Sequence, residues 1–190
     1  MNTSMRQRGF SLLELMITIT VMAILLVIAV PSFQSAIHRN EVSSASNNLL
    51  ASLSYARTEA IDRGQLVSLC PSSTGTSCTA GGQAYDPGWI VYTYPAGAAS
   101  ANKAPTATSL LLRANAAQSG VSIQSLGNTI VTFGQQGQLD PSTPTLEFVT
   151  CYRSGSSGVG TTSTAVPSVE LDVNGSGSVT TKTGTACTPT

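Results

Sequence analysis

The side chains in this sequence that could carry out redox or metal chemistry are four cysteines and one histidine. The cysteines are Cys70, Cys78, Cys151 and Cys187, and the histidine is His38. An even number of cysteines in an oxidising compartment favours two disulfides, and the spacings suggest that the first pairs with the second and the third with the fourth, although four cysteines allow three pairings. A zinc site is the rival interpretation. No C-x-x-C pair occurs and the histidine lies far upstream, so we expect no metal.

Catalysis by a nucleophile or by general acids and bases would need a nucleophile beside a base, or two placed carboxylates. The acidic residues that could approach one another in a sheet are Asp140, Glu147, Glu170 and Asp172. The last two alternate with valine and leucine along one predicted strand, which is typical of solvent-facing residues. No phosphate-binding loop or dinucleotide motif is present. We therefore predict that the chain is not an enzyme, has no catalytic residues and needs no cofactor.

The element that must position the rest of the chain begins with an apolar run at residues 10–30, FSLLELMITITVMAILLVIAV. As a helix this run would be about 30 Å long, enough to cross a bilayer. Arg6 and Arg8 precede it, so the positive-inside rule keeps the start cytoplasmic and sends the remainder across the membrane. A cleaved secretory signal is the alternative, but the run is longer than such signals and no small-x-small site follows it. We predict a retained, single-pass membrane helix.

Glu14 is the only charged residue in this apolar run. A carboxylate costs roughly 2.5–3.5 kcal/mol at the centre of a bilayer, and less near its edge. Two interpretations remain open from position alone. The carboxylate is either partly hydrated or protonated one turn from the interface, or it is paired with a cationic partner.

Residues 8–14, RGFSLLE, resemble the class III signal of type IV prepilins and pseudopilins. The resemblance implies that a prepilin peptidase cleaves between Gly9 and Phe10, so that residues 1–9 form a leader peptide. It also implies N-methylation of the new terminal residue, Phe10.

The same resemblance implies roles for two residues of the membrane helix. In the family, the carboxylate that corresponds to Glu14 meets the terminal amine of a neighbouring subunit as the filament grows. Such a pairing would make two groups tolerable in hydrocarbon that are each costly alone. Pro31 matches a proline that gently kinks the helix, which has a local cause because proline lacks a backbone donor.

A helical period continues beyond the apolar run. Its apolar residues recur at three- and four-residue steps: Val42, Ala45, Leu49, Leu53, Ala56 and Ala60. Gly64 is a suitable stop, so we predict one helix over residues 10–64, with 10–30 in the membrane and an apolar stripe on the second half. Four charged residues near its end, Arg57, Glu59, Asp62 and Arg63, are expected to form a solvated face with weak ion pairs.

From residue 65 the helical period disappears, and short β-branched or aromatic runs alternate with turn residues. The expected strands are Leu66–Cys70, Trp89–Tyr94, Leu110–Arg113, Val121–Leu126, Thr129–Phe133, Leu146–Tyr152 and Val169–Val173. The stretch 96–108 is expected to be a surface loop. The predicted fold is α+β and pilin-like, with a long N-terminal transmembrane helix packed on an antiparallel β-sheet head at residues 65–190.

The segments 47–50, 55–60 and 88–91, together with the Gly64 break, resemble the GspH/FimT family of minor pilins and pseudopilins. The resemblance implies a structural subunit of a type IV pilus or a type II secretion filament, anchored in the bacterial inner membrane with its C-terminal domain in the periplasm. It implies a role in assembly or initiation at the filament tip. The implied partners are the prepilin peptidase, other minor pilins or pseudopilins, the major subunit and the inner-membrane assembly platform. Nothing in the sequence separates the pilus from the secretion system.

DNA capture for natural transformation is the alternative function, because some FimT-like proteins bind DNA through a C-terminal Gly-Arg-x-Arg loop. The comparable residues here, 177–180, read GSVT and contain no arginine, and Lys182 follows alone. Nine basic residues balance nine acidic residues over the chain. Because non-specific DNA affinity comes mainly from lysine and arginine neutralising phosphates, nucleic acid is not expected as a partner.

Overall fold

The structure is a computed structural model that describes residues 10–98, 101–127, 130–140 and 145–189. It consists of an N-terminal unit that ends at Ile37 and a C-terminal unit that begins at His38, each described here by itself. The expected leader peptide, residues 1–9, lies outside the described residues.

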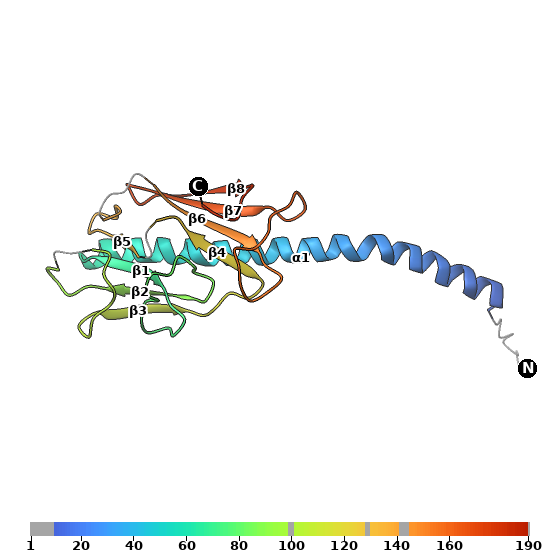
Figure 1. The fold of residues 1–190 in the computed structure, drawn as a ribbon, viewed down its shortest axis with the longest axis horizontal. Coiled ribbons are helices and arrows are strands. Elements are labelled where there is room, and N and C mark those ends of the chain that lie inside the picture. Colours follow the sequence, from blue (N-terminus) through green and yellow to red (C-terminus); the bar gives the residue numbers. More distant parts are fainter. Residues whose placement is uncertain (1–9, 99–100, 128–129, 141–144, 190) are drawn as a thin grey trace, which may run out of the picture. The chain divides into compact units, whose positions relative to one another are not determined.

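The long helix α1 spans Leu12–Arg63 and belongs to both units (Figure 1). It starts two residues later and ends one residue earlier than the sequence predicted. Its end has a local cause: Gly64 has a φ of 59°, and the amide of Gln65 donates to the carbonyl of Ala60 over 3.3 Å. This left-handed residue closes the helix as a glycine C-cap does.

Within the C-terminal unit, α1 buries one stripe of mostly small or aliphatic side chains. These are Val42, Ala45, Ser46, Leu49, Ser52, Leu53, Ala56 and Ala60. Their three- and four-residue steps place them on one side of the helix. The alanines and serines allow neighbouring backbones to come close, while Leu49 and Leu53 fill the space between them.

Among the described residues, the C-terminal unit forms two antiparallel sheets of four strands each, which confirms the predicted antiparallel β-sheet head and shows that it is divided in two. The first has the order β3-β2-β1-β5, and the second β4-β6-β7-β8. In the first sheet, the strands are β1 (Val67–Pro71), β2 (Trp89–Thr93), β3 (Leu110–Asn115) and β5 (Val131–Phe133). In the second, they are β4 (Val121–Ser125), β6 (Thr145–Tyr152), β7 (Ser168–Asn174) and β8 (Val179–Gly184).

Strand β8 was missed by the sequence reasoning. It is an edge strand whose one partner among the described strands is β7, and only its last residue is buried. Its sequence, VTTKTG, therefore carries little of the apolar alternation by which half-buried strands are recognised. The hairpin turn before it contains Asn174 and the glycines at 175 and 177, residues that favour tight turns.

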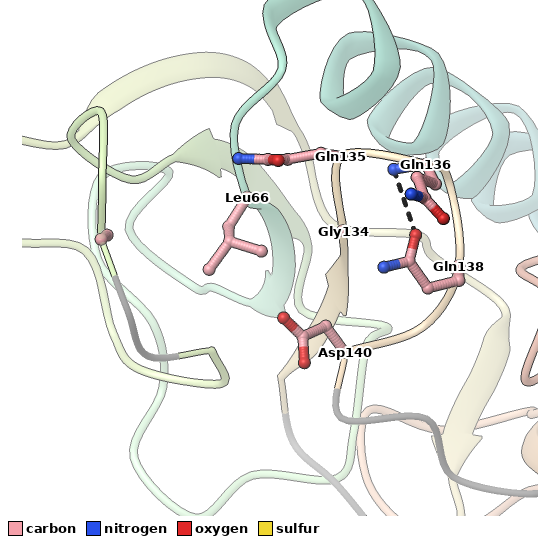
Figure 2. Close-up of a pocket in the computed structure, with 7 residues that line it drawn as sticks. Leu66, Gly134, Gln135, Gln136, Gln138 and Asp140 are labelled. Carbon is pink, nitrogen blue, oxygen red and sulfur yellow. Dashed lines mark hydrogen bonds between the residues drawn. The ribbon is translucent and has the colours of Figure 1, made fainter.

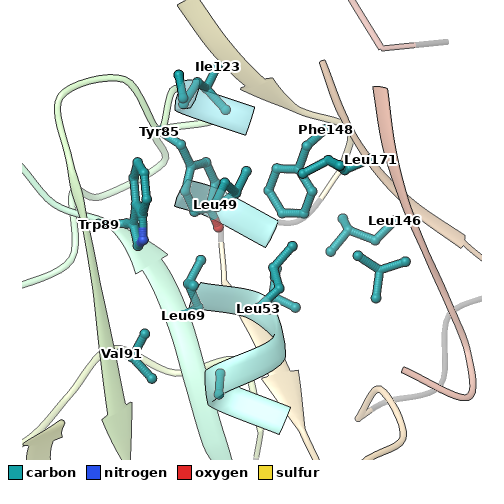
Figure 3. Close-up of a cluster of buried hydrophobic side chains, with 14 of the residues drawn as sticks. Leu49, Leu53, Leu69, Tyr85, Trp89, Val91, Ile123, Leu146, Phe148 and Leu171 are labelled. Atoms are coloured by element: carbon teal, nitrogen blue, oxygen red, sulfur yellow. The ribbon is translucent and has the colours of Figure 1, made fainter. Parts of the chain in front are cut away.

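The core of this unit lies where α1 meets both sheets (Figures 1 and 3). Leu49 and Leu53 of the helix, Trp89 of the first sheet and Phe148 of the second are fully buried. Tyr85, in the segment before β2, packs edge-on against Phe148 with ring centroids 5.1 Å apart. The two sheets and the helix thus share one hydrophobic core.

Candidate functional site

The N-terminal unit presents apolar side chains on all sides of its helix. Between residues 10 and 30 every residue is exposed, and α1 is the one helix of the described chain that is long and apolar enough to cross a membrane. A helix that is apolar all round is stable in lipid or in the interior of an assembly, not in water.

Glu14 lies in the first turn of α1, among these apolar residues. Its side chain is exposed, and it forms no ion pair or hydrogen bond with any residue that the structure describes. Phe10 is 83% exposed and lies just before the helix. Gly9, the other residue of the expected cleavage site, falls outside the described residues. The carboxylate therefore has no partner within the described part of its own chain.

Pro31 lies inside α1, and the helix continues through it. Because proline lacks an N–H group, the carbonyl one turn earlier receives no helical hydrogen bond. The hydroxyl of Ser35 donates to the carbonyl of Pro31 over 3.1 Å. A kink at this position stays a prediction.

Two disulfides lie in the C-terminal unit, one in each sheet. Cys70 of β1 is bonded to Cys78, and Cys151 of β6 to Cys187, with Cα atoms 5.6 and 5.7 Å apart. This is the pairing that the spacings suggested. Cys70 and Cys151 are fully buried. The two bonds therefore fix a surface loop and the C-terminal segment to interior strands, and they leave no free thiol.

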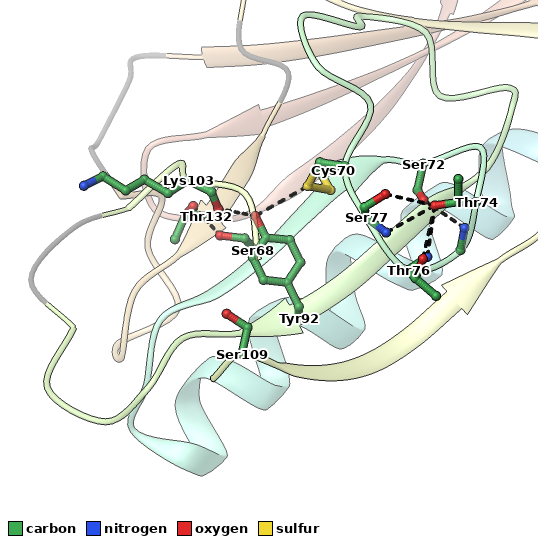
Figure 4. Close-up of a disulfide and its surroundings, with 12 residues drawn as sticks. Ser68, Cys70, Ser72, Thr74, Thr76, Ser77, Tyr92, Lys103, Ser109 and Thr132 are labelled. Carbon is green, nitrogen blue, oxygen red and sulfur yellow. Dashed lines mark hydrogen bonds between the residues drawn. A yellow bond between two sulfur atoms is a disulfide. The ribbon is translucent and has the colours of Figure 1, made fainter. Parts of the chain in front are cut away.

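The loop enclosed by the first disulfide is held by hydroxyl groups (Figure 4). The Thr74 Oγ1 atom accepts hydrogen bonds from the amides of Thr76 and Ser77 over 3.4 and 3.3 Å, and the amide of Gly75 donates to Ser72 Oγ. These are short-range turn contacts of a kind common for serine and threonine. The loop is a structural feature without a reactive group.

A buried tyrosine pair anchors the expected surface loop, residues 96–108, to the first sheet. The hydroxyls of Tyr92 and Tyr94 both donate to the carbonyl of Lys103, over 2.5 and 2.7 Å, and the amide of Lys103 donates back to Tyr94. Burial raises the pKa of the Tyr92 phenol above its usual value, with a smaller contribution from Tyr94. Tyr92 therefore acts as a hydrogen-bond donor here and not as a titrating group.

A nearly buried ion pair, missed by the sequence reasoning, joins the loop before β2 to the end of β6. Arg153 Nη2 lies 2.7 Å from Asp86 Oδ2, with side chains 11% and 7% exposed. Arg153 also donates to the carbonyl of Gly158. No sequence pattern connects residues 67 positions apart, so only the fold reveals this pair.

Three of the four candidate carboxylates do come together in the second sheet. Glu147 pairs in register with Asp172, while Glu170 lies two residues along the same strand and opposite Lys182. Lys182 forms an ion pair with Asp172, and the neighbouring carboxylates raise its pKa. These are half-buried groups balanced by a lysine, a common arrangement on the outer face of a sheet.

Neither the histidine nor the fourth carboxylate joins that group. His38 stacks on Tyr152, with ring centroids 3.8 Å apart, and contacts Glu41. In no part of the described chain do three or more His, Cys, Asp or Glu side chains converge closely enough to hold a metal ion. Asp140 instead lines a cavity of about 310 Å³ (Figure 2), together with Leu66, Ala98, Gly134, Gln135, Gln136 and Gln138. Amides dominate this cavity, and it contains no nucleophile with a base.

Arg57 corrects one expectation, since the sequence placed it on a solvated face. The side chain is half-buried, and it donates from Nε to the carbonyl of Gly137 over 3.0 Å and from Nη2 to that of Ser176 over 3.2 Å. It therefore connects α1 to the turn after β5 and to the β7–β8 hairpin. Its neighbour Arg63 forms the expected helical ion pair with Glu59.

The contacts of Arg57 depend on a close approach of two turns, one at Gly137 and one at Gly177, that the sequence does not reveal. Gly177 has a φ of 78°, and a Cβ atom there would overlap the carbonyl oxygen of Gly137. The two turns can lie against each other only because position 177 is glycine, and Arg57 then reaches both carbonyls. The residues compared with a DNA-binding loop, 177–180, are thus a structural turn and the start of β8.

The chain is similar to known proteins in both sequence and fold. Residues 45–177 match the family described as "Type II transport protein GspH", and residues 4–30 match the "Prokaryotic N-terminal methylation motif". The fold is similar to a crystal structure of the type IV minor pilin FimU of Pseudomonas aeruginosa, with a TM-score of 0.55, 20% identity, and coverage of 78% of this chain and 96% of that chain. A second crystal form of FimU gives a TM-score of 0.49, 18% identity, and coverage of 76% and 98%.

Proposed function

Since the chain belongs to the GspH family, whose matched region covers most of its length, we propose that it is a minor pilin or pseudopilin that is built into a membrane-derived filament. The observation that carries this proposal is the helix at residues 12–30, which is apolar on every side and lies within the matched methylation motif, residues 4–30. Such a surface is stable in the bilayer before assembly and in the interior of a helical filament afterwards.

We propose that the N-terminal motif is processed between Gly9 and Phe10, with methylation of the new terminal amine. Removal of residues 1–9 would leave Phe10 as the start of the mature chain, with Leu12–Arg63 as its helix and residues 65–190 as its head. The basic residues before the helix favour a periplasmic location of the head, by the positive-inside rule. The two disulfides fit that oxidising compartment.

Glu14 would fix the axial position of each subunit relative to its neighbour during assembly. Its carboxylate has no partner among the described residues of its own chain, and an ammonium group of a neighbouring subunit at Phe10 would neutralise it. An unpaired charge in hydrocarbon is costly, so a subunit that is displaced along the filament would leave two such charges exposed. This contact would join the chain to other minor subunits and to the major subunit on an inner-membrane assembly platform.

We place the chain near the filament tip, in initiation of assembly, as the family resemblance implies. The DNA-uptake alternative receives no support from the head. Lys182 is engaged by Asp172, and the β7–β8 hairpin carries no arginine. A surface for DNA would need several cations free to neutralise phosphates.

The test of the proposed function is the intact mass of the protein purified from membranes of cells with active prepilin peptidase, under reducing and non-reducing conditions. We expect a chain that starts at methylated Phe10 and is four hydrogens lighter when oxidised. As a control, Gly9→Leu should remain an uncleaved precursor. A wild-type mass that retains residues 1–9 would reduce the protein to a plain signal-anchored membrane protein and end the filament proposal.

A further inference from the structure

Arg57 lines a groove of about 290 Å³ between α1 and the β7–β8 hairpin, which we call the Arg57 groove. Its walls are Leu50, Ser54, Arg57 and Thr58 of the helix and residues 177–179 of the hairpin. The groove lies entirely within the C-terminal unit. Its lining combines one guanidinium group with the hydroxyls of a threonine and two serines.

The guanidinium group is fixed but its charge is not neutralised. The two acceptors of Nε and Nη2 are backbone carbonyls, which carry no net charge. No carboxylate lies within 4 Å of Arg57 among the described residues, and Nη1 has no hydrogen-bond partner there. A half-buried cation of this kind retains donors for a further, anionic acceptor.

The hairpin that forms the other wall is rigid before any ligand arrives. Asn174 Oδ1 accepts from the amide of Ser178 over 3.0 Å and from the hydroxyl of Ser176 over 2.7 Å, and the amide of Gly177 donates to the Asn174 carbonyl. Because internal contacts already hold both walls, the groove residues lose little conformational entropy when an anion binds. A pre-organised arginine fork with nearby hydroxyls is well suited to a carboxylate.

A single acidic side chain fits the groove better than a nucleic acid. Arg57 is the only cation among the described residues that line it, and the nearest basic residue along the hairpin, Lys182, is paired with Asp172. DNA affinity requires several phosphate contacts, whereas one carboxylate needs one fixed guanidinium. We propose that the Arg57 groove receives an aspartate or glutamate side chain from an adjacent pilin-like subunit.

This inference rests on the proposed function, since it needs a filament in which another subunit lies against the head. It adds a second contact to the one at Glu14, this time between folded heads. A charge-assisted hydrogen bond is worth about 1.5–3 kcal/mol, so loss of the contact should weaken the association of the two heads about tenfold or more.

The test introduces a carboxylate into the groove by substitution of a residue that lines it, Ser54. The carboxylate introduced by Ser54→Glu would lie three residues before Arg57 on the helix and pair with it, which blocks the groove while Arg57 keeps its two carbonyl acceptors. Ser54 is exposed, so Ser54→Glu and the matched, uncharged Ser54→Gln should both fold. A photoreactive phenylalanine at exposed Thr58 of the full-length protein, in cells that assemble filaments, then reports the neighbour.

We expect the cross-link from position 58 to reach a pilin-like subunit at a peptide that contains an acidic residue. Its yield should fall about tenfold in the Ser54→Glu background and stay near wild type with Ser54→Gln. Equal yields in the two backgrounds, a cross-linked peptide without an acidic residue, or a cross-link to DNA would each overturn the inference. If the wild-type chain is absent from purified filaments, the proposed function itself fails, which is a separate result from equal yields in filaments that contain it.

Discussion

The two disulfides should contribute unequally to the stability of the head, because they close loops of different length. The sequence separations are 8 residues for Cys70–Cys78 and 36 for Cys151–Cys187. In the chain-entropy treatment these loops correspond to about 2.5 and about 3.8 kcal/mol at 25 °C. The difference, about 1.3 kcal/mol, depends only on the ratio of the two lengths.

The double variants Cys70→Ala/Cys78→Ala and Cys151→Ala/Cys187→Ala form a matched pair. Each removes one fully buried and one partly buried sulfur, so the loss of packing is similar and largely cancels in the comparison. We expect the second variant to be less stable than the first, and both to be less stable than wild type.

The assay is urea unfolding of the full-length chain in non-ionic detergent, followed by tryptophan fluorescence. Trp89 is the only tryptophan and is fully buried in the head, so its emission reports the head and not the membrane helix. The free energy of unfolding comes from linear extrapolation of variants that share one m-value. A Cys70/Cys78 variant as destabilised as the Cys151/Cys187 variant would refute the loop-length reasoning.

Three further predictions concern single groups. Glu14→Val should leave membrane insertion and processing intact but reduce recovery in sheared filaments, and normal recovery would remove the pairing argument. Asp86→Asn should destabilise the head by about 3–5 kcal/mol because Arg153 keeps a buried charge without a partner, whereas a loss below 1 kcal/mol in urea unfolding would show that the pair is solvated. Burial raises the pKa of Tyr85 and Tyr92 in the folded state, so the unfolded chain releases their protons first as pH rises above about 10. Stability should therefore fall above that pH, and ultraviolet absorbance should show both phenols ionising only with unfolding.

The sequence predicted the elements that repeat an apolar pattern over several residues. The helix from residue 12 to residue 63 and the strands around Trp89 and Phe148 carry such patterns, and they were recovered to within a few residues. Three of the six residues of strand β8 are threonine and the strand lies at an edge, so no burial pattern marked it. The division into two sheets depends on which strands pair across long separations, and local periodicity carries no information on that choice.

Among the candidate site residues, those marked by a local pattern were predicted, and those that depend on long-range contacts were not. Glu14 was identified because a charge in an apolar run is visible in the sequence itself. Arg57 was assigned to a solvated face because its partners are backbone carbonyls 80 and 119 residues away, which no side-chain pattern could indicate. The Asp86–Arg153 pair escaped notice for the same reason.

The stripe on α1 that includes Leu49 and Leu53 has a consequence for how the head gains and loses structure. Both sheets bury their inner faces against the same stretch of helix, while the first sheet has in addition a small separate cluster around Cys70, Ile90, Tyr92 and Tyr94. Amide protons in β1 and β6 should therefore exchange with solvent through one common opening event, despite belonging to different sheets. Because both sheets depend on residues 38–63 to cover their inner faces, a fragment that carries one sheet without these residues should be degraded readily by proteases.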